Sequence, residues 1–233
     1  MFTLDLKKGI KPTDTLIFSH IGFSSRNILI STLSKDGNII KLTPENITLD
    51  EVVLQTDKIK LKLRKIGRSS KGLGLTHVNF YSYYEKDVDD RLGKEIGMKL
   101  NIKRNCHIEA LNFNITTNDF KALKFRVHFY KIESGQPSEL LVQKDIVFKI
   151  EDNFLGWFKV DLKPYEIYLE ENLDAVAVTI QWIESVKTDE KSQYFSISTA
   201  ASPLGTAFYR DKAMDLWSLS SQRNSFYLDA LCE

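Results

Sequence analysis

Apolar and polar residues alternate in short segments along the second half of the chain. The segment 123–131 reads LKFRVHFYK, with apolar side chains at 123, 125, 127 and 129 and polar or amphipathic ones at 124, 126, 128 and 130. A period of two is typical of a strand with one face buried. Turn residues separate this segment from similar ones at 111–115, 146–150, 158–162 and 195–197. Short strands at this spacing predict an antiparallel β-sandwich or barrel.

One segment has two apolar faces. In 175–182, AVAVTIQW, bulky apolar residues alternate with small or uncharged ones. This predicts a central strand that is covered on both sides, with Trp182 in the core. Only two short segments, 87–97 and 210–216, are helix candidates, and the glycines of the first make it a poor helix. The fold class is therefore predicted to be all-β.

Composition and charge exclude several classes of protein. The 233 residues include 32 basic and 31 acidic side chains, so a net charge of +1 gives no global attraction to nucleic acid or to an anionic membrane. No segment approaches the roughly 18 consecutive apolar residues of a membrane-spanning helix. We therefore predict no nucleic-acid partner and no membrane span.

A local basic run interrupts this balance. Between Lys58 and Lys71 the chain has seven basic residues and no acidic one. The run has two interpretations: a strand with Ile59, Leu61 and Leu63 facing inward and solvated lysines between them, or a strip that binds phosphates. We favour the first, because nucleic-acid surfaces combine such strips with stacking aromatic rings. The run is treated as a linker between a fragment at 1–56 and a larger domain at 57–233.

The two cysteines carry little information about the cellular compartment. Cys106 and Cys232 match no metal-ligand or redox spacing such as C-x-x-C. They are compatible with a disulfide or with two buried free thiols, and we favour the free thiols.

Three blocks near the N-terminus resemble a known family. They are TLIFSHIGF at 15–23, IIKL at 39–42 and LDEVVL at 49–54. In this order they resemble the closing half of the carboxypeptidase-like regulatory domain, which implies a partial immunoglobulin- or transthyretin-like sandwich. Gly22 suits a tight turn, and Asp36-Gly37 is a hairpin signal between 28–33 and 39–42.

The opening half of that family's pattern is absent. Met1 to Leu4 resembles the strand that follows the missing part. Either the sequence starts late, which we favour and which would also remove a signal peptide, or the sheet is completed in another way. An incomplete sandwich would expose an edge strand to association.

The remaining segment resembles the jelly-roll-like β-sandwich that follows such domains in bacterial cell-envelope proteins of unassigned function. The resemblance lies in a series of strands, among them IEALNFNI at 108–115, GWFKVDL at 156–162 and AVTIQW at 177–182. It implies an envelope location, periplasmic or outer-membrane associated, and a structural or interaction role. The implied partner is another envelope protein or a glycan.

Histidines provide one candidate metal site. His107 and Glu109 lie two residues apart on a predicted strand and face the same way, and His77 or His128 would complete a set of two histidines and a carboxylate. The strand pattern places no further ligand beside the first pair, so we predict no metal site.

The polar side of 123–131 is a second candidate. His128 lies between Arg126 and Tyr130 on this side, which fits an anion site or a solvent-facing row, and we favour the row. The chain has no G-x-S-x-G, G-x-x-x-x-G-K-[ST], G-x-G-x-x-G or H-E-x-x-H motif. We therefore predict a non-catalytic protein without a cofactor.

Aromatic residues supply the candidate ligand-binding residues, which are Trp157, Tyr81, Tyr83 and Tyr84. Trp157 falls on the face opposite the apolar stripe of its strand, and exposed rings are stacking platforms for sugars. Packing in the core or at a sheet edge is the alternative for Trp157, and the one we favour. Two functions are carried forward: a structural or interaction module, and a carbohydrate-binding or carbohydrate-active protein with an aromatic and acidic cleft.

Overall fold

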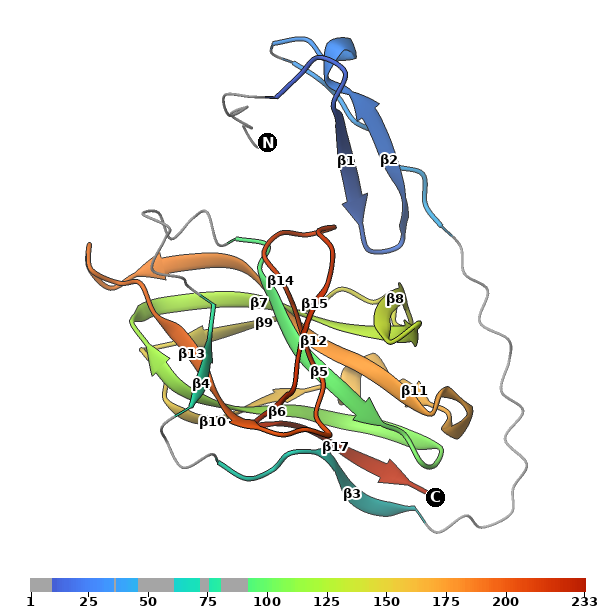
Figure 1. Cartoon of the computed structure of the whole chain (residues 1–233), viewed down its shortest axis with the longest axis vertical. Helices are drawn as coiled ribbons and strands as arrows, with labels where there is room; N and C mark the ends of the chain where they lie inside the picture. Colours follow the sequence, from blue (N-terminus) through green and yellow to red (C-terminus); the bar gives the residue numbers. More distant parts are fainter. Residues whose placement is uncertain (1–9, 36, 46–60, 72–75, 81–91) are drawn as a thin grey trace. The chain divides into compact units, whose positions relative to one another are not determined.

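The regular structure of the described residues is almost entirely β-strand. The computed structural model describes residues 10–35, 37–45, 61–71, 76–80 and 92–233. These residues divide between two compact units, Met1–Gln55 and Thr56–Glu233, whose elements are labelled in Figure 1. Every regular element of the described residues is a β-strand or a single turn of 3-10 helix, so the all-β prediction is confirmed.

The first unit is built on a β-hairpin. Strands β1 (Thr15–His20) and β2 (Phe23–Leu29) pair antiparallel. Gly22 lies in the turn between them with φ +79°, a conformation that glycine adopts without strain. A single turn, η1 (Ile30–Thr32), follows β2.

The first unit buries little. None of its described residues is fully buried, and Ile17, Leu29 and Ile39 are 49%, 47% and 82% exposed. The expected hairpin around Asp36-Gly37 is wrong, because residues 37–43 form no strand; Asp36 itself lies outside the described residues. The described part of this unit therefore has no hydrophobic core of its own.

The described residues of the second unit hold the remaining strands and two further single turns. They are β3 (Lys62–Gly67), β4 (His77–Asn79), β5 (Glu95–Asn101), β6 (Cys106–Asn118), β7 (Phe120–Glu133), β8 (Gln136–Leu140), β9 (Ile146–Glu151), β10 (Gly156–Asp161), η3 (Lys163–Tyr165), β11 (Ile167–Leu169), η4 (Glu171–Leu173), β12 (Ala175–Lys187), β13 (Phe195–Ala201), β14 (Ala207–Arg210), β15 (Ser218–Ser220), β16 (Gln222–Asn224) and β17 (Phe226–Cys232).

These strands form two antiparallel sheets. In the β6 sheet the order is β16-β13-β6-β17-β3, and β10, β11 and β4 pair alongside. In the β12 sheet the order is β15-β14-β5-β12-β7-β8, and β9 pairs with β7. The alternating segments of the sequence become β6, β7, β9, β10 and β13, which confirms the predicted antiparallel sandwich.

The core lies between the two sheets and is rich in aromatic rings. Phe113 of β6, Phe125 of β7 and Trp182 of β12 have 0% exposure. Phe125 contacts Phe148 with ring centres 5.7 Å apart and Phe195 with ring centres 5.0 Å apart. The first eight residues of β12 are all buried, so the prediction of a central strand covered on both faces is confirmed. Fully burying each such ring stabilises the fold by about 2–3 kcal/mol.

Neither of the two helix candidates is helical in its described residues. Residues 92–94 of the first candidate form a turn and Glu95 begins β5, while 87–91 lie outside the described residues. Gly97 sits within β5, where a Cβ would lie 2.1 Å from the carbonyl oxygen of Val178, so close approach to β12 explains the glycine. Residues 211–216 of the second candidate are turn and coil.

The basic run contributes a strand to the sandwich and is not simply a linker. Lys62–Gly67 forms β3, which pairs with β17 at the end of the β6 sheet. The predicted facing is also wrong: Leu61 and Leu63 are 52% and 68% exposed, and Ile66 packs against the core. Because side chains alternate along a strand, Arg64 lies on the same side as Ile66.

A disulfide joins Cys106 at the start of β6 to Cys232 at the end of β17. The two residues are direct partners in the strand register, with their Cα atoms 4.1 Å apart. The expectation of two free thiols is therefore wrong. Pairing strands that lie 126 residues apart in sequence brings the thiols together, and no sequence spacing indicates this.

Candidate functional site

A buried ion cluster lies on the outer face of the β12 sheet. Glu95 Oε1 lies 2.8 Å from His128 Nδ1 and also accepts a hydrogen bond from the Thr179 hydroxyl. Glu95 Oε2 accepts bonds from Arg210 Nε at 2.9 Å and Nη2 at 2.6 Å. Arg210 Nη2 also donates to the Tyr130 hydroxyl at 3.0 Å. The four neighbouring strands β14, β5, β12 and β7 supply these groups.

The cluster keeps Glu95 ionised. Burial alone would raise the pKa of this fully buried carboxyl, but the hydrogen bond with His128, the positive charges of His128 and Arg210 and the bond from Thr179 lower it to about 2. For Tyr130, burial and the charge of Glu95 raise the pKa well above its usual value. A permanently charged carboxylate that is fully bonded is a poor general base at neutral pH.

Aromatic rings cover the cluster. The Trp217 ring lies 4.4 Å from the Arg210 guanidinium carbon and contacts the rings of Tyr130 and Phe208. His128 and Tyr130 are each 6% exposed. The expectation of a solvent-facing row on this side of β7 is therefore wrong for these two residues. The cluster is a closed structural element of the sheet.

Trp157 lies on the outer face of the β6 sheet. It is directly opposite Asn114 on β6, and Tyr227 of β17 is directly opposite Asn112. The Trp157 and Tyr227 rings meet with centres 5.3 Å apart at 68°, so they come together across β6. Lys65 Nζ lies 5.0 Å from the centre of the Tyr227 ring. Both rings are half-buried. Because their planes are steeply inclined to each other, a flat ligand can stack on one of the two rings but not on both.

The other candidate ligand-binding residues, Tyr81, Tyr83 and Tyr84, fall outside the described residues. Trp182 is in the core as predicted.

The histidines do not gather around a metal. His107 Nδ1 lies 2.8 Å from Glu109 Oε1, and Lys163 Nζ lies 3.3 Å from Glu109 Oε2. The bond with His107, more than the contact with Lys163, lowers the pKa of Glu109. His128 belongs to the other sheet, bound to Glu95. Among the described residues no three metal-ligating side chains come together.

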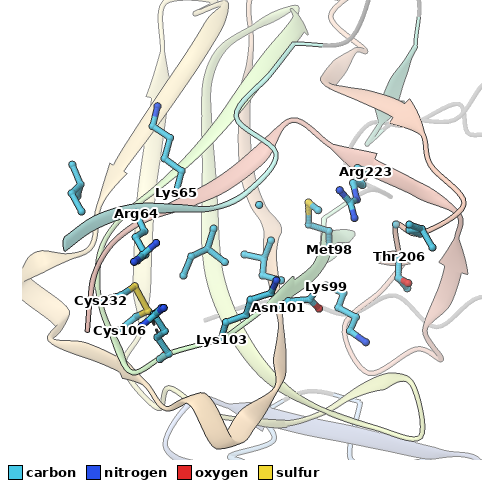
Figure 2. A pocket seen from close by; sticks show the side chains of 17 residues that line it. Arg64, Lys65, Met98, Lys99, Asn101, Lys103, Cys106, Thr206, Arg223 and Cys232 are labelled. Carbon is cyan, nitrogen blue, oxygen red and sulfur yellow. Dashed lines mark hydrogen bonds between the residues drawn. A yellow bond between two sulfur atoms is a disulfide. The ribbon is translucent and has the colours of Figure 1, made fainter. Parts of the chain in front are cut away.

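A groove of about 670 Å³ opens between the edges of the two sheets. Residues 63–67 of β3 form one side of it and residues 98–101 of β5 form the other. The disulfide lies at one end beside Arg64 and Lys103, and Thr206 and Arg223 lie toward the other end (Figure 2). The volume is within the range of about 300–1,000 Å³ that is typical of ligand sites.

The groove is strongly basic. Six basic residues line it, namely Arg64, Lys65, Lys99, Lys103, Arg104 and Arg223, and no aspartate or glutamate does so among the described residues. The Lys65 side chain is directed away from the groove toward Tyr227, so the other five residues determine its charge. In a chain with 31 acidic residues, this separation of charge makes the groove the main candidate binding surface.

Sequence reasoning identified only part of this groove. The run from Lys58 to Lys71 pointed to β3, but Lys99, Lys103 and Arg223 reach the groove from other parts of the chain. Their only signal in the sequence is an absence of nearby acids, which is too common to be useful. Glu95 and Arg210 were missed because both lay in segments interpreted as short helices.

No model of a known protein family matches the chain, and no functionally described protein matches its sequence. The resemblance to the carboxypeptidase-like regulatory domain therefore stays a prediction. Within the described residues, no helix has the length and apolar character to cross a bilayer.

Proposed function

We propose that this protein is a non-catalytic β-sandwich module of the cell envelope, with an interaction role. The observation that carries this proposal is the Cys106–Cys232 disulfide. Disulfides persist in oxidising compartments such as the periplasm and the cell surface and are rare in the cytosol. This bond supports the envelope location that the sequence resemblance implies.

The arrangement of ionisable groups supports an interaction role over catalysis. Glu95 is a buried carboxylate next to a histidine, but its partners satisfy both oxygens and hold its pKa near 2. The groove presents cations, which suit binding of a negatively charged partner. A jelly-roll topology for the second unit is part of the same proposal.

Thiol labelling of the protein in its native host tests the location. We expect the protein in the envelope fraction, with Cys106 and Cys232 blocked to maleimide under denaturing conditions and labelled only after reduction. Lysis in excess alkylating agent is the control against oxidation during preparation. Recovery from the cytosolic fraction with both thiols alkylated would contradict the proposal.

A carbohydrate-binding role is the second candidate function. The observation in its favour is that Trp157 lies half-buried on the outer face of the β6 sheet beside Tyr227, with Asn114 and Asn112 of β6 directly opposite the two residues. Asn112 Nδ2 already donates to Asp229 at 2.9 Å, which reduces the polar groups left for a sugar.

A glycan-binding measurement on Trp157 variants tests this candidate. If the ring stacks on a sugar, Trp157→Ala weakens binding by about tenfold or more, since one stacking contact contributes about 0.5–1.5 kcal/mol beyond its buried area. Tyr168→Ala removes another exposed ring from the same sheet and should leave binding unchanged. Equal binding by wild type and Trp157→Ala would exclude this ring as the platform.

A further inference from the structure

The groove is bounded by two strand edges with unpaired main-chain groups. Arg68 and Phe226 exchange two main-chain hydrogen bonds of 3.0 Å, so alternate residues of β3, including Ile66 and Arg64, also face β17. The N–H and C=O groups of Leu63 and Lys65 therefore face the other edge, with which no described strand pairs.

The edge of β5 is open on the same side. Strand β14 pairs only with the first four residues of β5, and the Lys99 N–H still donates to the Thr206 carbonyl at 2.9 Å. By alternation, the main chain of Asn101 points to this side as well, beyond the end of β14. The two sheets come close where Gly67 meets Leu100.

The charge of the groove indicates which kind of partner it binds. Arg64 comes from β3, Lys99 from β5, Lys103 and Arg104 from the loop before β6, and Arg223 from β16. Among the described residues no carboxylate side chain forms an ion pair with Arg64, Lys103 or Arg223. Cations gathered without counter-charges attract a partner that carries several negative charges.

The lining also discriminates between kinds of anion. No aromatic ring lines the groove among the described residues. Bases of single-stranded nucleic acid and the rings of sugars are usually held by stacking on aromatic side chains. A polypeptide instead uses the unpaired N–H and C=O groups of a sheet edge, by adding a strand to it.

We infer that the groove between β3 and β5 binds an extended acidic segment of another protein, which adds as a strand to the free edge of β3 and places its carboxylates against Arg64, Lys103 and Arg223. Four residue steps from Leu63 to Gly67 span about 13 Å, enough for a few residues of such a segment. This inference deepens the proposed interaction role and rests on it.

Fluorescence polarisation with synthetic peptides tests the inference on the full chain. The probe is a labelled peptide of alternating glutamate and threonine. We expect it to bind, with affinity that falls as salt rises, and to bind about tenfold more tightly than the same peptide with glutamine in place of glutamate. Methylation of alternate peptide nitrogens should abolish binding, because a strand then cannot pair with β3.

Variants of the protein locate the site. Arg64→Glu should weaken binding by about tenfold or more, because it places a negative charge against the peptide. Lys159→Glu, which changes an exposed lysine on the outer face of the β6 sheet, should leave it unchanged. Arg223→Glu tests the other end of the groove, and thermal unfolding of each variant verifies that it is folded.

Several results would overturn the inference. They are equal binding by the N-methylated peptide, an unchanged affinity in both Arg64→Glu and Arg223→Glu, no binding of the acidic peptide at low salt, and tighter binding of a sulfated oligosaccharide or of oligothymidylate. None of them bears on the thiol labelling that tests the envelope location, so the two proposals fail separately.

Discussion

Replacing Cys106 and Cys232 together with alanine lowers the free energy of unfolding of the second unit by about 3–5 kcal/mol. The disulfide closes a loop over a sequence separation of 126 residues, and in the chain-entropy account a loop of this size restricts the unfolded chain strongly. Urea unfolding followed by tryptophan fluorescence, to which the fully buried Trp182 contributes, measures the change.

Reduction of the wild-type protein is the matched experiment. The reduced protein should unfold at the same lower urea concentration as the double alanine variant, since both lack the bond between β6 and β17. The alanine variant should show no response to the reductant. An unfolding midpoint that is unaffected by either change would show that the disulfide contributes nothing to stability.

Replacing Glu95 with glutamine destabilises the protein by about 3 kcal/mol at neutral pH. The pKa of Glu95 is depressed from 4.5 to about 2 in the folded protein. A depressed carboxyl pKa stabilises the fold above the unfolded-state pKa, and this stabilisation is lost as the pH falls through the folded-state pKa. The wild type and the variant should therefore differ most above about pH 5 and converge toward pH 2.

Urea midpoints of both proteins across this pH range provide the measurement. Glu109→Gln is the matched control, since Glu109 also pairs with a histidine and a lysine, but near the surface, where solvent screens the interaction. It should cause a much smaller loss. A difference between wild type and Glu95→Gln that does not vary with pH would contradict the ionised state assigned to Glu95.

The sequence predicted the sandwich because its strands bury one face and expose the other. The alternation in 123–131 and the two apolar faces of 175–182 are local consequences of where β7 and β12 lie. Which face of the sheet a residue lies on follows from the alternation with its neighbours in the sequence, so the pattern alone was sufficient to predict these strands.

The features that bear on function depend on contacts between distant segments. Glu95 and Arg210 lie 115 residues apart and meet only because β5 and β14 pair. The cysteines meet through β6 and β17 in the same way. The basic run has the opposite alternation from the predicted one, because Leu63 is exposed and Ile66 packs on the core. As a result the side chain of Arg64 lies on the inner side of β3 and lines the groove.

The ion cluster around Glu95 has a consequence for how faithfully the chain folds. Its members belong to four adjacent strands, and a slip of one residue in any of them would turn the slipped side chain to the opposite face of the sheet. A slip of β5 would bury the Glu95 carboxylate among apolar rings without a partner, at a cost of several kcal/mol. Such a slip also turns apolar side chains out of the core, and the stranded carboxylate adds to that cost, so Glu95 reinforces the alignment of β14, β5, β12 and β7.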